Sequence, residues 1–506
     1  MNGWRGSPQA FLVVVGLLMG VALLPVVSGC TSGPKTSIGR VIEAVGDRLH
    51  PLPPETEREV QRFADVYRQY AKSPDQDRLD YFGFAFKRVR TKYVREVPDK
   101  EMIDAAIKGV VDLKAEANSL PAANVVEAAL DSMVTSLDPH SAYMNREEFN
   151  ESFIHTKGEF GGLGIEVTMQ DGVVKVVAPI EDTPAASAGV AAGDLITHVD
   201  GESIKGLTLS QAVRRMRGSP GTSIRLTLQR KDVADFDVTL VRAIIQVRAV
   251  RWRVIDRIGY VRVSRFSERM EGGIVKAFAA IRAELGGDPD GVILDLRNNP
   301  GGLLDQSIVL ADAFLDSGEI VSVRGRDKAR HRAFGAQEGD MARGLPMVVL
   351  INGGSASASE IVASALKFHG RATVMGVRSF GKGSVQTIIP MPEEGALRLT
   401  TALYYGPDGH TIQARGITPE IRIESGKTAK ERQREADLPG ALPGEKGTAM
   451  DNAAAISEDA CPAIQGGFRR GAKPGEGDRT LGCAVAFIGA GSKQKFLAAY
   501  GQPRSM

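Results

Sequence analysis

The sequence predicts an α/β multidomain protein with an N-terminal helical segment, a β-rich module, and an α/β core whose sheet is partly parallel. Three observations predict this order. Apolar residues recur at three- and four-residue spacing over about 79–155, and they alternate every second residue in 156–242. In 243–424, short apolar runs alternate with helical patterns. The 506 residues are enough for about three domains.

The composition is that of an ordinary globular protein, with 43% hydrophobic and 25% charged residues. A formal net charge of +2 and the lack of a basic tract give no reason to expect nucleic-acid binding. No spacing of ligand residues is typical of a metal site, so we expect neither a metal nor another cofactor.

Residues 1–29 have the pattern of an export signal. Arg5 precedes an apolar run from Ala10 to Val27, which is marginal in length for a membrane span. The run ends in Val27-Ser28-Gly29-Cys30, which resembles a bacterial lipobox. That resemblance implies a lipidated Cys30 at the mature N-terminus and a membrane-anchored lipoprotein on the periplasmic side. An uncleaved anchor helix is the alternative.

The two other cysteines, Cys461 and Cys483, lie near the C-terminus. In an extracytoplasmic compartment they could form a disulfide, although the sequence is also compatible with two free thiols. The surrounding segment, 425–506, is Gly-, Pro- and charge-rich at its start and is interpreted as a linker and a tail.

Two helical stretches precede the β-rich module. Residues 30–78 are interpreted as a linker with one helix inside "ETEREVQRFADVYRQYA". Residues 79–155 contain three further periodic runs, "DYFGFAFKRVRTKYV", "DKEMIDAAIKGVVDLKAEA" and "NVVEAALDSMVTSL", and are predicted to form a small helical domain.

Residues 156–242 are predicted to form a compact β-rich module. "GGLGIEVTMQDGVVKVVAPI" alternates and contains an Asp171-Gly172 turn, and the run "AGVAAGDLITHVDG" follows it. With these two motifs the module resembles a PDZ domain. The resemblance places Gly162, Leu163, Gly164 and Ile165 in the peptide-binding loop. There, backbone N–H groups would face the terminal carboxylate of a peptide that pairs with the adjoining strand edge.

The core, 243–424, contains "PMVVLINGGSASASEIVASALKFHG", which predicts a buried strand, a turn of small residues and a helix. Such a turn can hold a nucleophilic serine at a strand end, with the helix N–H groups facing an oxyanion. The Gly-x-Ser-x-Gly spacing of α/β-hydrolases is missing. Ser357 and Glu360 also form a capping box, so a purely structural role for Ser357 is the competing interpretation.

A nucleophilic serine needs a base, and Lys382 in "SFGKGSVQ" is the best candidate. A lysine becomes a base when burial lowers its pKa, and Gln386 could accept a hydrogen bond from the amine. His140 and His410 are alternatives for a Ser–His arrangement, whereas His369 ends the helix too far from Ser357. The run from Gly376 to Lys382 resembles the start of a P-loop, but Gly383 replaces the Ser or Thr and a β-like run follows.

A third segment, "LDLRNNPGGLL", ends a predicted strand with Asp295 and Arg297. Its Gly301-Gly302 pair would let backbone N–H groups approach a reacting carbonyl closely.

Together with "LDPHSAYM" and "GHTIQARGITPEI", these segments resemble the carboxyl-terminal processing peptidases, or tail-specific proteases, over about 80–424. These are serine endopeptidases with an inserted PDZ domain. The resemblance implies that Ser357 is the nucleophile, Lys382 the base and Gln386 its support. It implies oxyanion donors on the backbone of Gly301, Gly302 and Ala358, and Arg217 as a link between the PDZ module and the core.

The expected function is therefore processing or degradation of extracytoplasmic proteins after the PDZ module binds their C-terminus. Partners are protein or peptide substrates and a membrane, while a homo-oligomer or an adaptor protein is left open. A PDZ-bearing scaffold that presents peptides without cutting them is the alternative from another class. We expect Ser355 and Ser359 to tolerate alanine.

Overall fold

The computed structural model describes residues 52–170, 172–180, 182–246, 248–392, 395–424, 433–444, 453–465 and 477–501. The predicted export signal and Cys30 lie outside these residues. Within them, no helix has the length and apolar character needed to cross a membrane.

Helices dominate the first part of the chain. They are α2 (Pro54–Tyr70), α3 (Gln76–Lys92), α4 (Asp99–Val111) and α5 (Ala122–Thr135), followed by α6 (Arg146–Lys157). Asp75 caps α3 by accepting from the Arg78 N–H at 2.8 Å. Buried residues of α2 to α5 form one hydrophobic cluster, which also includes Leu397 and Leu399 of a core strand. The helical part thus packs against the core.

The β-rich module has the sheet order β3-β4-β5-β7-β8, with β6 paired to β5. Its strands are β3 (Ile165–Gln170), β4 (Val173–Pro179), β5 (Leu195–Val199), β6 (Glu202–Ser203), β7 (Ser223–Gln229) and β8 (Phe236–Val241). Two helices, α7 (Pro184–Ser187) and α8 (Leu209–Met216), complete it. Antiparallel pairing of β2 (Glu159–Gly162) with β9 (Ala243–Gln246) joins the chain entering the module to the chain leaving it.

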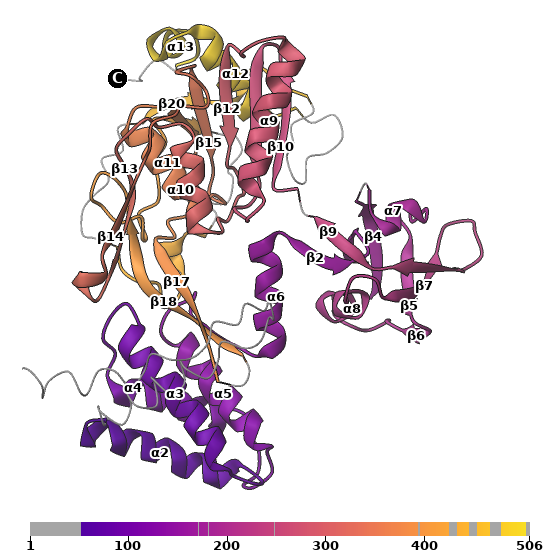
Figure 1. The fold of residues 1–506 in the computed structure, drawn as a ribbon, viewed down its shortest axis with the longest axis vertical. Helices are drawn as coiled ribbons and strands as arrows, with labels where there is room; N and C mark the ends of the chain where they lie inside the picture. The colour runs from indigo at the N-terminus through magenta and orange to yellow at the C-terminus, as the bar shows by residue number, and fades with distance from the viewer. Residues whose placement is uncertain are drawn as a thin grey trace, which may run out of the picture. The chain divides into compact units, whose positions relative to one another are not determined.

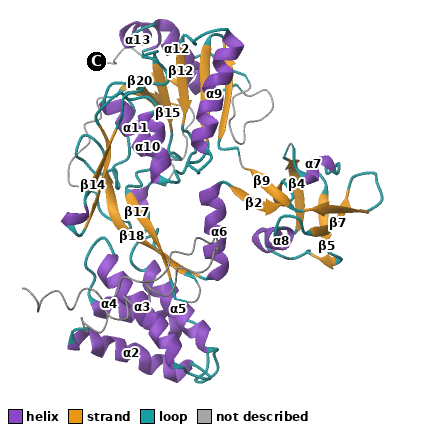
Figure 2. Ribbon diagram, viewed as in Figure 1, coloured by secondary structure: helices purple, strands orange, loops and turns teal. Residues whose placement is uncertain are grey.

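The core has a seven-stranded sheet in the order β10-β11-β12-β15-β16-β19-β20 (Figures 1 and 2). All neighbours from β11 to β20 are parallel, and β10 is an antiparallel edge strand. The strands are β10 (Val250–Ile255), β11 (Ile258–Val263), β12 (Gly291–Asp295), β15 (Met347–Ile351), β16 (Thr373–Gly376), β19 (Ile421–Glu424) and β20 (Ala454–Ser457). The predicted partly parallel sheet is confirmed.

Helices cover both faces of this sheet, because its central strands are apolar on both sides. In β12, Val292 and Leu294 face a cluster that contains α9 (Met270–Leu285), α10 (Leu304–Asp312) and α11 (Ala358–Phe368). Ile293 faces a second cluster with α12 (Arg479–Ala490) and α13 (Lys493–Tyr500), drawn in yellow in Figure 1.

A second core sheet is antiparallel and was not expected from the sequence. It contains β1 (Ala142–Met144), β13 (Glu319–Gly325), β14 (Arg332–Gly335), β17 (Ser384–Pro390) and β18 (Ala396–Tyr405). Strand β18 pairs with β1, which follows α5, and with β13 and β17 of the core. This sheet therefore joins the helical part to the core.

The C-terminal segment, interpreted as a tail, supplies β20, α12 and α13 to the core. Cys461 and Cys483 form a disulfide across 22 residues, which answers the question that the sequence left open.

Candidate active site

Three loops meet at one edge of the parallel sheet. They follow β12, β15 and β16, which are adjacent in the strand order. Because parallel strands all end at the same edge, their carboxyl-terminal loops lie side by side. These loops contain the Gly301-Gly302 turn, Ser357 and Lys382.

Ser357 lies where the loop after β15 meets α11, in a strained conformation. Its φ of 54° and ψ of −114° fall outside the regions that non-glycine residues normally adopt. Strain of this kind is concentrated at functional sites, where the surrounding structure enforces it. Ser357 is half-buried, whereas Ser355 and Ser359 are completely buried.

The two neighbouring serines tie the Ser357 loop to the loop after β12. The Ser355 hydroxyl donates to the Leu296 carbonyl at 2.8 Å, and the Ser359 hydroxyl donates to the Asn299 carbonyl at 2.9 Å. Each of these carbonyls also accepts from a backbone N–H, Leu296 from Asn299 and Asn299 from Ala356. Alanine at position 355 would leave the Asn352 N–H without its acceptor, the Ser355 hydroxyl, at 2.9 Å. The expectation that both serines tolerate alanine stays a prediction.

The Gly301-Gly302 turn lies directly against Ser357. A Cβ added to Gly301, whose φ is 101°, would come within 2.9 Å of the Ser357 Cβ and 3.0 Å of the Ala358 nitrogen. The Gly301 N–H donates to Asn299 Oδ1 at 2.9 Å. Among the described residues, the N–H groups of Gly302 and Ala358 have no protein acceptor. The three backbone donors selected from sequence are thus close together, and one of them is already engaged.

A buried carboxylate, Glu360, joins the Ser357 loop to the Lys382 loop. Glu360 Oε2 accepts from the backbone N–H groups of Ser357 at 2.8 Å and Lys382 at 2.9 Å. Oε1 accepts from the Ser379 hydroxyl at 2.5 Å and the Gly381 N–H at 2.6 Å. Burial raises the pKa of Glu360 to about 7, although the four hydrogen bonds act in the opposite direction.

The capping box read from the sequence accounts for only one of these bonds, the one from the Ser357 N–H. The link to the Lys382 loop was missed, because it joins Glu360 to residues about 20 positions later in the chain.

Lys382 lies between β16 and β17, and its side chain has the environment expected of a base. Burial lowers the pKa of its ammonium group, and the carboxylates of Glu435, Asp138 and Glu360 counteract this in part. The residue is half-buried.

Gln386 is in β17, four residues after Lys382. Its Nε2 donates to the hydroxyls of Ser384 at 2.9 Å and Thr400 at 3.2 Å. These two bonds fix the orientation of the amide and leave Oε1 as its acceptor atom.

The two histidines kept as alternatives, His140 and His410, and the rejected His369 occupy different environments. His140 Nε2 contacts the buried Glu435 carboxylate at 2.8 Å. His410 lies in an exposed turn, where its N–H is bound by Asp408. His369 ends α11, and its Nε2 contacts the Glu319 carbonyl.

Glu435 and Gln413 are site residues that the sequence did not reveal. Gln413 accepts from the Gly383 N–H at 2.9 Å and donates to Glu435 at 2.8 Å, so the pair holds the backbone next to Lys382.

In the β-rich module, the predicted loop runs from the end of β2 to the start of β3. Leu163 is buried in the module's core, and Gly164 has a φ of 77°. A Cβ on Gly164 would lie 2.3 Å from Thr183, so only glycine fits. Strand β3, which begins at Ile165, is an edge strand of the sheet and can accept another strand. The Arg217 guanidinium lies 4.9 Å from the ring centre of Phe160 in β2.

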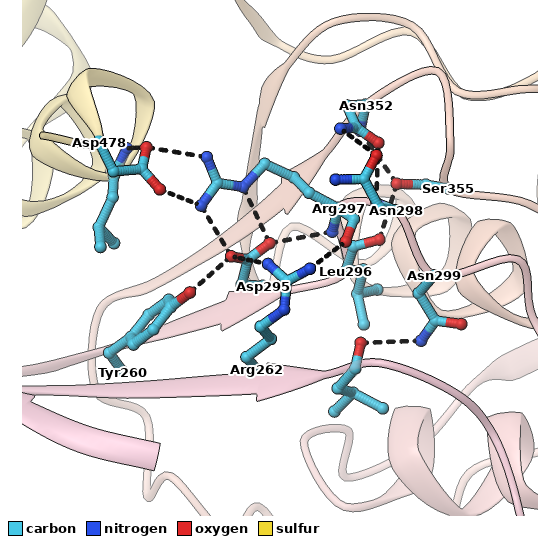
Figure 3. Close-up of polar contacts among 12 residues, drawn as sticks. Tyr260, Arg262, Asp295, Leu296, Arg297, Asn298, Asn299, Asn352, Ser355 and Asp478 are labelled. Carbon is cyan, nitrogen blue, oxygen red and sulfur yellow. Dashed lines mark hydrogen bonds and ion pairs between the residues drawn. The ribbon is translucent and has the colours of Figure 1, made fainter. Parts of the chain in front are cut away.

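The loop that leads from β12 to the Gly301-Gly302 turn begins in a buried cluster of charged residues around Asp295 and Arg297 (Figure 3). Asp295 accepts from Tyr260, Arg262 and Arg297, and Arg297 also donates to Asp478 from the C-terminal segment. The sequence pointed to Asp295 and Arg297 but gave no signal for Asp478.

Comparisons with known proteins agree with the resemblance seen in the motifs. Residues 257–423 match the model of peptidase family S41, and residues 175–230 match a PDZ domain. The carboxy-terminal-processing protease of Bartonella bacilliformis is 52% identical over 348 residues, which is 68% of this chain and 75% of that protein. The carboxy-terminal processing protease CtpA of Bacillus subtilis is 32% identical over 377 residues, 74% of this chain and 75% of that protein.

A third relative, a probable CtpA-like serine protease of Staphylococcus haemolyticus, is 36% identical and covers 60% of this chain and 61% of that protein. These matches favour an enzyme over a peptide-presenting scaffold. The chain belongs to peptidase family S41, as a serine-type carboxy-terminal-processing protease with a PDZ domain.

Proposed function

We propose that the protein is a serine endopeptidase that uses Ser357 as nucleophile and Lys382 as general base, with Gln386 supporting the lysine. The observation that supports this most strongly is the Glu360 carboxylate, one oxygen of which binds the N–H groups of both Ser357 and Lys382. The backbones of the proposed nucleophile and base are therefore held by one atom.

In the first step, the neutral Lys382 amine takes the proton of the Ser357 hydroxyl as Oγ attacks the scissile carbonyl carbon. The tetrahedral intermediate then collapses, the C–N bond breaks, and the Lys382 ammonium gives its proton to the leaving amine. Water hydrolyses the resulting ester by the same route, with Lys382 again acting as base.

Backbone N–H groups would stabilise the oxyanion of each intermediate. Gly302 and Ala358 are the better donors, because the Gly301 N–H is engaged by Asn299. Gly301 instead allows the close approach of the turn to Ser357.

Substrates would be delivered through the PDZ domain by their C-termini. The edge strand β3 and the loop at Gly162, Leu163, Gly164 and Ile165 support binding of an extended peptide end. Arg217, which lies over Phe160 of the strand leading into this loop, would link peptide binding to the core.

The dyad is tested by hydrolysis of casein and of a protein with an apolar C-terminal tag. We expect Ser357→Ala and Lys382→Ala each to reduce cleavage to background, because the nucleophile or its base is removed. His140→Ala and His410→Ala are the matched variants. Retained cleavage in either dyad variant, or loss of cleavage confined to a histidine variant, would overturn the proposal.

We further propose that Cys30 carries a lipid and holds the enzyme at a membrane on the periplasmic side. The lipobox-like sequence Val27-Ser28-Gly29-Cys30 supports this. Metabolic labelling with a palmitate analogue is expected to mark the wild-type chain and not Cys30→Ala, which should leave the membrane fraction. Equal labelling and membrane retention of the variant would contradict the anchor.

A further inference from the structure

The Asp295–Arg297–Asp478 cluster joins the C-terminal segment to the loop that adjoins Ser357 (Figure 3). The Arg297 guanidinium is buried and donates two hydrogen bonds to each of two carboxylates. It donates to Asp295 at 2.7 and 3.0 Å and to Asp478 at 2.7 and 3.0 Å. Such two-pronged pairing fixes the plane of the guanidinium as well as its position.

The cluster is balanced in charge only when Asp478 is present. Arg262 and Arg297 face Asp295 and Asp478, and each of these four residues is buried. Burial raises the pKa of Asp295, but the Arg297 and Arg262 guanidinium groups outweigh it and hold this pKa at about 2. Without Asp478, one buried positive charge would lack a partner, an arrangement that is strongly unfavourable.

Asp478 is itself held firmly, although it lies 181 residues from Arg297. Its backbone exchanges two hydrogen bonds with Ile464, and its carboxylate caps α12 by accepting from the Leu481 N–H at 2.9 Å. The Cys461–Cys483 disulfide closes this part of the chain on either side of Ile464 and Asp478.

From Arg297 the chain leads directly to the turn beside Ser357. The Arg297 carbonyl accepts from Arg262, and the Asn298 N–H donates to Asn352 of the Ser357 loop. The next residue, Asn299, accepts from the Ala356 N–H at 3.0 Å and from the Ser359 hydroxyl. A shift of Arg297 would therefore move the Gly301-Gly302 turn relative to Ser357.

We propose that Asp478 is a positioning residue for catalysis, which acts through Arg297 to hold the 297–302 turn in register with Ser357. The proposal rests on the proposed function in one respect, namely that this turn supplies an oxyanion donor. It assigns a catalytic purpose to the disulfide-closed C-terminal segment.

Two substitutions separate this role from helix capping. Asp478→Asn and Asp478→Ser both keep a good N-cap residue for α12, but neither offers Arg297 a carboxylate. With fluorescein-labelled casein we expect kcat per active site to fall by about tenfold or more, with KM within about twofold, since the defect lies in the transition state. The concentration of active sites is measured by titration with a fluorophosphonate. Unfolded molecules are then not counted, and kcat refers to folded enzyme alone.

Ser492→Ala is the matched control. It removes the cap of α13, where the Ser492 hydroxyl accepts from the Lys495 N–H, and it does not touch Arg297. We expect it to lower thermal stability while kcat per active site stays within about twofold. Asp478→Glu, which restores the charge, should recover part of the loss.

The inference is overturned if both Asp478→Asn and Asp478→Ser keep wild-type kcat per active site, or if Ser492→Ala lowers it equally. If neither Asp478 variant yields titratable sites, the carboxylate serves folding alone, and the inference is overturned as well. Failure of the dyad is a separate result, because it appears as retained cleavage by Ser357→Ala or Lys382→Ala.

Discussion

At the scale of single residues, the site depends on two buried ionisable groups whose pKa values move in opposite directions for the same reason. Desolvation disfavours the charged form of each group, so burial lowers the pKa of Lys382 and raises that of Glu360. The neutral amine is the form that can accept a proton from Ser357. The ionised carboxylate is the form that can accept hydrogen bonds from all four of its donors.

These shifts predict how activity depends on pH. The neutral fraction of Lys382 rises with pH and reaches one half below the ordinary lysine pKa of 10.5, because burial lowers the pKa. Glu360 becomes fully ionised above its pKa of about 7. Both changes increase activity with rising pH, so log(kcat/KM) should rise with a slope above one on its acid side and reach a plateau.

The Glu360→Gln variant serves as the control for this profile. The amide does not titrate, and its NH2 group would face donors instead of accepting from them. We expect a slope of one and a kcat lower by about 100-fold, the effect of a small misplacement of catalytic groups. An unchanged profile in Glu360→Gln would exclude Glu360 from the acid limb. A midpoint for the Lys382 titration at or above pH 10.5 would contradict a lowered Lys382 pKa.

At the scale of elements, the C-terminal strand and helices are part of the core. Strand β20 extends the parallel sheet beside β19, and α12 and α13 cover one face of it. The disulfide connects Cys461, just after β20, to Cys483 within α12. It therefore restrains the segment that carries Asp478.

Removing the disulfide should destabilise the protein by about 3 kcal/mol, because the unfolded chain regains the entropy lost by closing a loop of 22 residues. The double variant Cys461→Ala/Cys483→Ala, compared with the wild type in denaturant unfolding, measures this. Adding a reducing agent should lower the wild-type unfolding midpoint and leave the double variant unchanged. Equal effects on both would show that the reductant acts elsewhere.

The sequence predicts well those elements whose signals are local. The run "DKEMIDAAIKGVVDLKAEA" contains α4, because its apolar spacing alone defines a helix face. The antiparallel sheet was missed, since β18 pairs with strands up to about 250 residues away and no local pattern encodes such partners.

In the candidate active site, too, only some features could be predicted from the local sequence. The strand–turn–helix around Ser357 could be predicted from residue types, whereas the pairing of Ser357 with Lys382 came from the family resemblance. The role of Asp478 could not be predicted from the sequence. An aspartate before a helix is typical of an ordinary N-cap, and its contact with Arg297 spans 181 residues.

At the scale of the whole molecule, the order of strands in the parallel sheet explains how distant segments form one site. Strands β12, β15 and β16 are neighbours in space, so the loops after them meet although they lie between residues 295 and 384 of the chain. The helices on one face place the N-terminus of α11 at this edge, and those on the other face bring Asp478 to it.

The Arg297–Asp478 pair has a consequence for the order of events during biosynthesis. A chain emerges from the ribosome N-terminus first, so Ser357, Lys382 and the PDZ domain are all synthesised before residue 478. A chain truncated before Asp478 would leave Arg297 with Asp295 alone. Such a chain would possess every proposed catalytic group, and we expect it to lack the contact that holds the turn beside Ser357 in place.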